Sequence, residues 1–111
     1  DAAKHDEIVA AISHVPHAAA SALMLAVVDQ PGFRRFAAGA GLRDSTRVAA
    51  GEENLWVGIM LANARHTAAG LLAVERRAAE LRTAIEANDV PTLRRLLAEA
   101  RIARQNLDRP E

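Results

Sequence analysis

Two imidazoles and two guanidinium groups are the side chains of this sequence whose spacing best suits chemistry. His14 and His17 stand three residues apart, on either side of Pro16, so on a helix they share one face. Arg43 and Arg47 stand four apart, which places them side by side on a helix. Because a guanidinium group binds a carboxylate through two parallel hydrogen bonds, these pairs predict a polar pocket that binds an organic anion.

Other kinds of site receive less support from the sequence. Trp56, the only tryptophan, could form a flat apolar wall of the pocket, although a lone tryptophan also commonly lies in a core. Each histidine alone could equally be a hydrogen-bonded core residue. The two imidazoles have no third ligand at suitable spacing and the chain has no cysteine, so no metal site is predicted. No phosphate-binding glycine loop, nucleophile elbow or pair of acid–base carboxylates appears, so no catalytic residue is predicted.

The histidines lie in the most apolar stretch of the chain, Ile8–Val28, which contains no Asp, Glu, Lys or Arg. Its apolar residues recur at steps of three and four, which predicts one long helix, and Pro16 predicts a kink in it. Asp6 and Glu7 should occupy the first turn, after a lead-in over residues 1–4. The stretch is long enough to cross a membrane, but two imidazoles, a proline and two serines disfavour contact with lipid. A buried helix that does not enter a membrane is therefore expected.

A loop and a short helix should follow. The sequence Asp-Gln-Pro-Gly over residues 29–32 should end the first helix, and Gly39 and Gly41 predict a loop with unusual backbone angles. Residues 42–48 are predicted to form a short helix. The oxygens of residues 44–46, Asp-Ser-Thr, should accept hydrogen bonds at its start.

A single long central helix is predicted from Glu52 to Asn88, because apolar residues recur at helical spacing and no proline interrupts them. Asp89 and Pro91 suit the N-cap and first turn of a last helix. No stretch alternates as a strand would. The predicted fold class is all-α, with one domain over residues 1–111.

Composition and charge narrow the function classes. Fourteen basic and fourteen acidic residues give no net charge, which argues against binding to nucleic acid or to a membrane surface. The absence of cysteine is consistent with a reducing cytoplasm. The apolar surface of the first and central helices exceeds what so small a chain can cover, which predicts a twofold homodimer. The chain begins with Asp1 rather than Met and reads as a piece of a longer protein.

Five blocks, in this order and spacing, resemble the C-terminal domain of prephenate dehydrogenases: His5-Asp6, Ser13-His14-Val15-Pro16-His17, Gly41–Ala49, Leu55-Trp56 and Leu61-Ala62-Asn63. The resemblance covers essentially the whole chain. It implies a helical dimerisation domain of the type found at the C-terminus of 6-phosphogluconate dehydrogenase. In prephenate dehydrogenases an N-terminal Rossmann domain, which has no counterpart in this sequence, binds NAD or NADP. The implied reaction is the oxidative decarboxylation of prephenate to 4-hydroxyphenylpyruvate in tyrosine biosynthesis, or of arogenate to tyrosine.

The same resemblance implies a set of substrate-binding side chains, namely His17, Arg47, Arg43, Trp56, Asp44 and His14. Of these, His17 corresponds to a substrate-facing histidine and Arg47 to the arginine that holds a substrate carboxylate. Trp56 corresponds to a tryptophan at the entrance of the site. The family's catalytic histidine lies in the Rossmann domain, so this chain alone is expected to be inactive and to hold no cofactor.

Two departures and two alternatives stay open. Leu42 stands where an aromatic residue is common in the family, and Gly58 where an aspartate is usual, so the packing around the arginines is not settled by the resemblance. The chain could instead be a stand-alone helical interaction module, or the helical domain of another NAD(P)-dependent dehydrogenase of the arogenate or 3-hydroxyacid type. The choices between prephenate and arogenate, and between NAD and NADP, also stay open.

Overall fold

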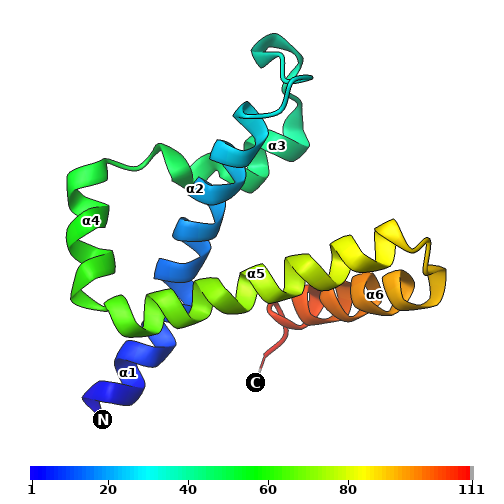
Figure 1. Ribbon diagram of the computed structural model, residues 1–111. Coiled ribbons are helices and arrows are strands. Elements are labelled where there is room, and N and C mark those ends of the chain that lie inside the picture. Colours follow the sequence, from blue (N-terminus) through cyan, green and yellow to red (C-terminus); the bar gives the residue numbers. More distant parts are fainter. Residues whose placement is uncertain (111) are drawn as a thin grey trace. The chain divides into compact units, whose positions relative to one another are not determined.

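The computed structural model describes residues 1–110, and every regular element in that range is a helix (Figure 1). The all-α class predicted from the sequence is confirmed. The residues form two compact units, of which the first is Asp1–Val74 and the second begins at Glu75.

The first unit starts with a continuous helix of 27 residues, Ala2–Val28. It consists of α1 (Ala2–Val9), the π-helical turn η1 (Ala10–His14) and α2 (Val15–Val28). Asp1 caps it, since its carboxylate accepts a hydrogen bond from the backbone N–H of Lys4 at 2.8 Å. The lead-in predicted over residues 1–4 is therefore wrong, because the oxygen of Asp1 satisfies a free N–H group and allows the helix to begin earlier.

Pro16 widens the helix locally and does not end it. Proline has no N–H group, and its ring would collide with the carbonyl four residues earlier, that of Ile12, in a regular α-helix. In η1 the backbone N–H of Val15 instead donates to the carbonyl of Ala10, five residues back. This π-helical turn accommodates the proline, and the helix continues to Val28, just before the predicted breaker sequence.

The predicted short helix is present, but its start and capping differ from the prediction. After the 3₁₀ turn η2 (Arg35–Ala37), α3 (Ala40–Thr46) is followed by a second 3₁₀ turn, η3 (Arg47–Ala50), and α2 packs against both α3 and η3. Gly41 lies inside α3, and no glycine in the described residues has a positive φ. Residues 44–46 end α3 and do not cap its start; the Thr46 hydroxyl donates to the carbonyl of Leu42 at 2.7 Å.

The uninterrupted helix predicted from Glu52 to Asn88 is wrong. Two helices, α4 (Glu53–Ala62) and α5 (Ala64–Glu86), meet at 99° around Asn63, whose φ of −129° and ψ of 40° are not helical. The side-chain amide of Asn63 donates to the carbonyl of Asp6 in α1 at 2.8 Å. An asparagine side chain readily hydrogen-bonds to backbone groups and is therefore unfavourable inside a helix. The spacing of apolar residues gives no sign of such bonds.

Small side chains build the interior of the first unit. Ala10, Val15 and Ala20 are buried, and among the described residues no large side chain is completely enclosed. Gly70 brings α5 against the first helix so closely that a Cβ there would come within 2.4 Å of Val15 Cγ2. Close backbone approach therefore supplies the packing that large side chains supply in other cores.

The second unit is a hairpin formed by the C-terminal part of α5 and by α6 (Val90–Asn106) (Figure 1). Asn88 has a positive φ of 52°, a conformation that asparagine tolerates, and only Asp89 separates it from α6. As predicted, Asp89 caps α6, accepting from the backbone N–H of Thr92 at 3.2 Å. Ala84 and Leu96 are buried between the two helices' facing sides.

Much apolar surface of the first unit is uncovered. The helix Ala2–Val28 is long and apolar enough to span a membrane, with a mean hydropathy of 1.6, and only 22% of that apolar window is buried. The exposed fractions of Ile12, Leu25 and Leu61 are 73%, 65% and 70%. Apolar surface of this extent marks a contact with another molecule.

Candidate functional site

A pocket of about 460 Å³ lies where the first helix, η3 and the start of α4 meet. Its lining consists of Ile12, Ser13, Pro16, His17, Arg47, Val48, Gly51 and Trp56. Three of the six predicted binding residues therefore share one pocket.

An aromatic stack forms one wall of the pocket. The ring of His17, which is only 6% exposed, lies on the indole of Trp56 with their centroids 3.7 Å apart and their planes at 14°. Gly51 lies against both rings, since a Cβ there would stand 2.8 Å from Trp56 Nε1 and 3.1 Å from His17 Cε1. Glycine at residue 51 thus leaves room for both rings, and the stack on Trp56 holds the imidazole.

Arg47 supplies the charge of the pocket. It begins η3 and is exposed, and within residues 1–110 it forms no salt bridge. The lining residues include no carboxylate. A cation without a competing carboxylate, beside a held imidazole, suits a ligand with a carboxylate group.

Arg43 and Asp44 lie elsewhere. The Nε of Arg43 donates to the carbonyl of Ala38 at 3.3 Å, in the loop before α3, and neither Arg43 nor Asp44 lines the pocket. Only Arg47 of the predicted arginine pair does so. Regular helical spacing between the two is broken where α3 ends at Thr46 and a 3₁₀ turn begins. Substrate roles for Arg43 and Asp44 stay predictions.

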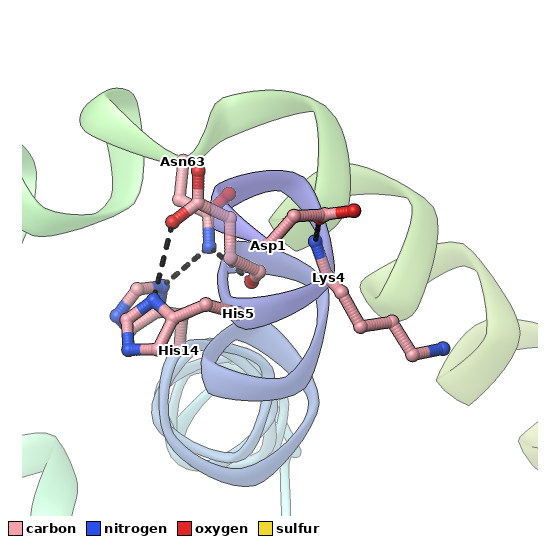
Figure 2. Close-up of polar contacts among 6 residues, drawn as sticks. Asp1, Lys4, His5, His14 and Asn63 are labelled. Atoms are coloured by element: carbon pink, nitrogen blue, oxygen red, sulfur yellow. Dashed lines mark hydrogen bonds and ion pairs between the residues drawn. The ribbon is translucent and has the colours of Figure 1, made fainter.

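His14 contacts the Trp56 member of the aromatic stack. Its ring lies roughly perpendicular to the indole, with centroids 6.5 Å apart and planes at 79°, and its Nδ1 lies 3.3 Å from Nδ2 of Asn63 (Figure 2). Both His14 and His17 therefore contact Trp56, which confirms that they share a face of the helix. A direct role of His14 in binding stays a prediction, since it does not line the pocket.

Sequence reasoning assigned no role to Gly51 or Asn63, two neutral residues that lie against Trp56 and His17 or against His14. Asn63 was expected to lie inside a long helix. A signal for Asn63 was present, because an asparagine in the middle of an apolar helical pattern is a poor helix former. No comparable signal marked Gly51, whose importance comes from the nearby Trp56 and from His17, 34 residues earlier in the chain.

Residues 1–99 match the protein family described as "Prephenate dehydrogenase, dimerization domain". The prephenate dehydrogenase of Lactococcus lactis subsp. cremoris is 29% identical over 97% of this chain and 31% of its own length. The cyclohexadienyl dehydrogenase of Zymomonas mobilis is 37% identical over 90% of this chain and 36% of its own length. The chain thus spans about a third of the length of these relatives.

Two solved structures share the helical architecture. The Synechocystis arogenate dehydrogenase matches with a TM-score of 0.87 and 29% identity, over 95% of this chain and 40% of that one. The prephenate dehydrogenase from A. aeolicus, solved with hydroxyphenyl propionate and NAD+, matches with a TM-score of 0.81 and 29% identity, over 94% of this chain and 37% of that one.

Proposed function

Because the chain belongs to the prephenate dehydrogenase dimerization-domain family, we propose that it is the helical part of a prephenate dehydrogenase. The complete enzyme would convert prephenate to 4-hydroxyphenylpyruvate, with loss of carbon dioxide and reduction of NAD+ or NADP+. The observation that carries this proposal is the pocket in which Arg47, His17 and Trp56 meet. Prephenate is a dianion with a small ring, and it requires a cation, a hydrogen-bond donor and an apolar wall.

Each of these three residues has a distinct task in the proposal. Arg47 binds a substrate carboxylate through two parallel N–H···O hydrogen bonds, a geometry that only a guanidinium group offers. His17 donates a hydrogen bond from its ring to the substrate. Trp56 covers the substrate ring and keeps water from the polar contacts, which strengthens them. Since His17 is held by stacking before the substrate arrives, little conformational entropy is lost on binding.

We assign the dinucleotide to the part of the protein outside this chain. A Rossmann phosphate loop needs the pattern Gly-x-Gly-x-x-Gly, and the nearest stretch here, from Gly39, has Asp44 where the third glycine belongs. A carboxylate at that position would repel the pyrophosphate. The residues of this chain therefore do not fit the cofactor, and hydride transfer belongs to the remainder of the enzyme.

The uncovered apolar surface supports a homodimer as the proposed assembly. The exposed fractions of Ile8, Leu25 and Leu61 are 49%, 65% and 70%, and a second copy of the chain would cover such residues. A stable interface buries about 1,200–2,000 Å² or more. A biosynthetic dehydrogenase of this kind is expected in the cytoplasm.

The purified protein that contains this chain tests the proposal. With prephenate and either NAD+ or NADP+, we expect the absorbance of the reduced cofactor to rise while 4-hydroxyphenylpyruvate accumulates. Parallel assays with arogenate decide between the two substrates, a choice made relevant by the likeness to an arogenate dehydrogenase. No reduced cofactor with either substrate and either dinucleotide would contradict the proposed function.

A further inference from the structure

Asn63 lies outside the pocket, yet its side chain connects two elements that shape it. Its amide nitrogen donates to the carbonyl oxygen of Asp6 at 2.8 Å and contacts Nδ1 of His14 at 3.3 Å (Figure 2). These partners lie 57 and 49 residues earlier in the chain. One amide therefore ties the bend between α4 and α5 to two successive parts of the first helix.

The two contacts together determine which ring nitrogen of His14 carries the proton. A backbone carbonyl only accepts, so the group that faces Asp6 must be the NH₂ group of Asn63 and not its oxygen. The same NH₂ group faces His14, and it carries only donors. Nδ1 of His14 is therefore the acceptor, and the proton of the neutral imidazole lies on Nε2.

A continuous series of contacts leads from Asn63 to the pocket. The ring of His14 makes a T-shaped contact with Trp56, with centroids 6.5 Å apart. Trp56 in turn stacks on His17 at 3.7 Å, and both of these residues line the pocket. A substitution of Asn63 would therefore shift His14 and, through it, the Trp56 ring that lines the pocket.

We propose that Asn63 is a positioning residue for the pocket. Its two hydrogen bonds set the bend between α4 and α5 and the tautomer of His14, and they thereby hold Trp56 against His17. The predicted effect on substrate affinity rests on the proposed function. The tautomer of His14 and the environment of Trp56 do not depend on it.

The test uses the full-length protein, with Asn63→Asp as the main variant. Aspartate has the same shape but only acceptor atoms, so it cannot donate to the carbonyl of Asp6 and it favours a proton on Nδ1 of His14. Asn63→Leu removes donors and acceptors alike. Asn106→Asp makes the same chemical change at an exposed position of α6 and serves as the matched control.

Three measurements follow. Long-range ¹H–¹⁵N spectra, with the His14 signals assigned through their loss in His14→Gln, report which ring nitrogen carries the proton. The part of the tryptophan fluorescence that is lost in Trp56→Phe comes from Trp56, and its intensity and wavelength report on the stack with His17. Steady-state kinetics with the substrate report affinity, and we expect KM to rise roughly threefold to thirtyfold in both Asn63 variants, with kcat nearly unchanged.

In the unmodified protein we expect Nδ1 of His14 to be unprotonated. In Asn63→Asp we expect a proton on Nδ1, altered Trp56 emission and a raised KM. A proton on Nδ1 of His14 in the unmodified protein would overturn the proposal, and that measurement needs no variant to fold. So would Asn63→Asp with a moved proton but unchanged emission and KM. Inactivity of the unmodified protein would count against the proposed function alone, since the spectra and the emission would still decide the role of Asn63.

Discussion

His17 and Trp56 can stack at a centroid distance of 3.7 Å because residue 51 has no side chain between them and the backbone of η3. Gly51→Ala would place a Cβ 2.8 Å from Trp56 Nε1, so the indole must move. Overpacking of this kind costs about 1–3 kcal/mol. We expect altered Trp56 emission and, in the complete enzyme, a KM raised about tenfold, because the displaced indole changes the wall of the pocket.

Gly41→Ala is the matched control, since a Cβ at Gly41 would meet no heavy atom within 4 Å. It should leave both quantities unchanged. Unaltered emission and KM in Gly51→Ala would mean that the stack tolerates displacement and does not shape the pocket.

Residue types and spacing indicated a polar pocket near the histidine and arginine pairs, and the family resemblance implied His17, Arg47 and Trp56 as binding residues; these three line one pocket. Residue types and spacing were not enough to predict which arginine lines the pocket, because that depends on the change from α-helix to 3₁₀ turn after Thr46. Nor could spacing reveal the bond from Asn63 to Asp6, since a contact 57 residues away leaves no periodic signal.

The contact between α5 and the first helix depends on Gly70. Gly70→Ala would bring a Cβ within 2.4 Å of Val15 Cγ2, and we expect the free energy of unfolding in urea to fall by about 1–3 kcal/mol. Gly58→Ala, in α4, meets no heavy atom within 4 Å and should stabilise the helix by about 0.5–1 kcal/mol. Equal effects of the two variants would show that helix propensity, and not close packing, decides the stability.

The cap of α6 gives a prediction for acid conditions. The hydroxyl of Thr92 and then its backbone N–H hold the pKa of Asp89 below its usual range. A carboxylate with a lowered pKa in the folded state stabilises the fold above its ordinary pKa of about 3.9, and this stabilisation disappears as the pH falls through the lower folded value. Asp89→Ala should therefore lower the Tm at neutral pH, with a difference from the unmodified protein that shrinks as the pH falls below about 3.9.

Asp89→Asn provides the control, because asparagine caps helices nearly as well and does not titrate. Its Tm should stay close to that of the unmodified protein at neutral pH. A deficit of Asp89→Ala that persists undiminished in acid would mean that the charge of Asp89 contributes nothing to the cap.

Some helix ends follow from local sequence. Asp89 and Pro91 mark the start of α6, and the breaker sequence over residues 29–32 follows the end of α2. The π-helical turn before Pro16 was expected only as a kink, because the way a helix accommodates a proline depends on what packs around it.

On the scale of the whole molecule, the exposed apolar side chains are best explained by a dimer. Leu61→Glu would place a charge at a residue of α4 that is 70% exposed in the single chain. A lone chain tolerates such a change, whereas a covered interface does not, because an unpaired buried charge costs several kcal/mol. We expect sedimentation equilibrium at micromolar concentration to show a dimer that Leu61→Glu converts to monomer.

Gln105→Glu introduces the same charge at an exposed polar position and should leave the dimer intact. A folded monomer in the unmodified protein at that concentration would contradict the proposed assembly. The chain spans about a third of the length of its relatives, so the activity of the complete protein is proposed from the family together with the pocket.

The most direct measurement is the KM for prephenate of the complete enzyme with Arg47→Ala, Arg47→Lys and Arg43→Ala. Charged hydrogen bonds contribute about 1.5–3 kcal/mol, so Arg47→Ala should lower kcat/KM roughly ten- to hundredfold, mainly through KM. Arg47→Lys should restore part of the loss, because an ammonium group cannot form the two parallel bonds. Arg43→Ala should have little effect, since Arg43 does not line the pocket. An unchanged KM in Arg47→Ala, together with a raised KM in Arg43→Ala, would contradict the account and move the carboxylate site to Arg43.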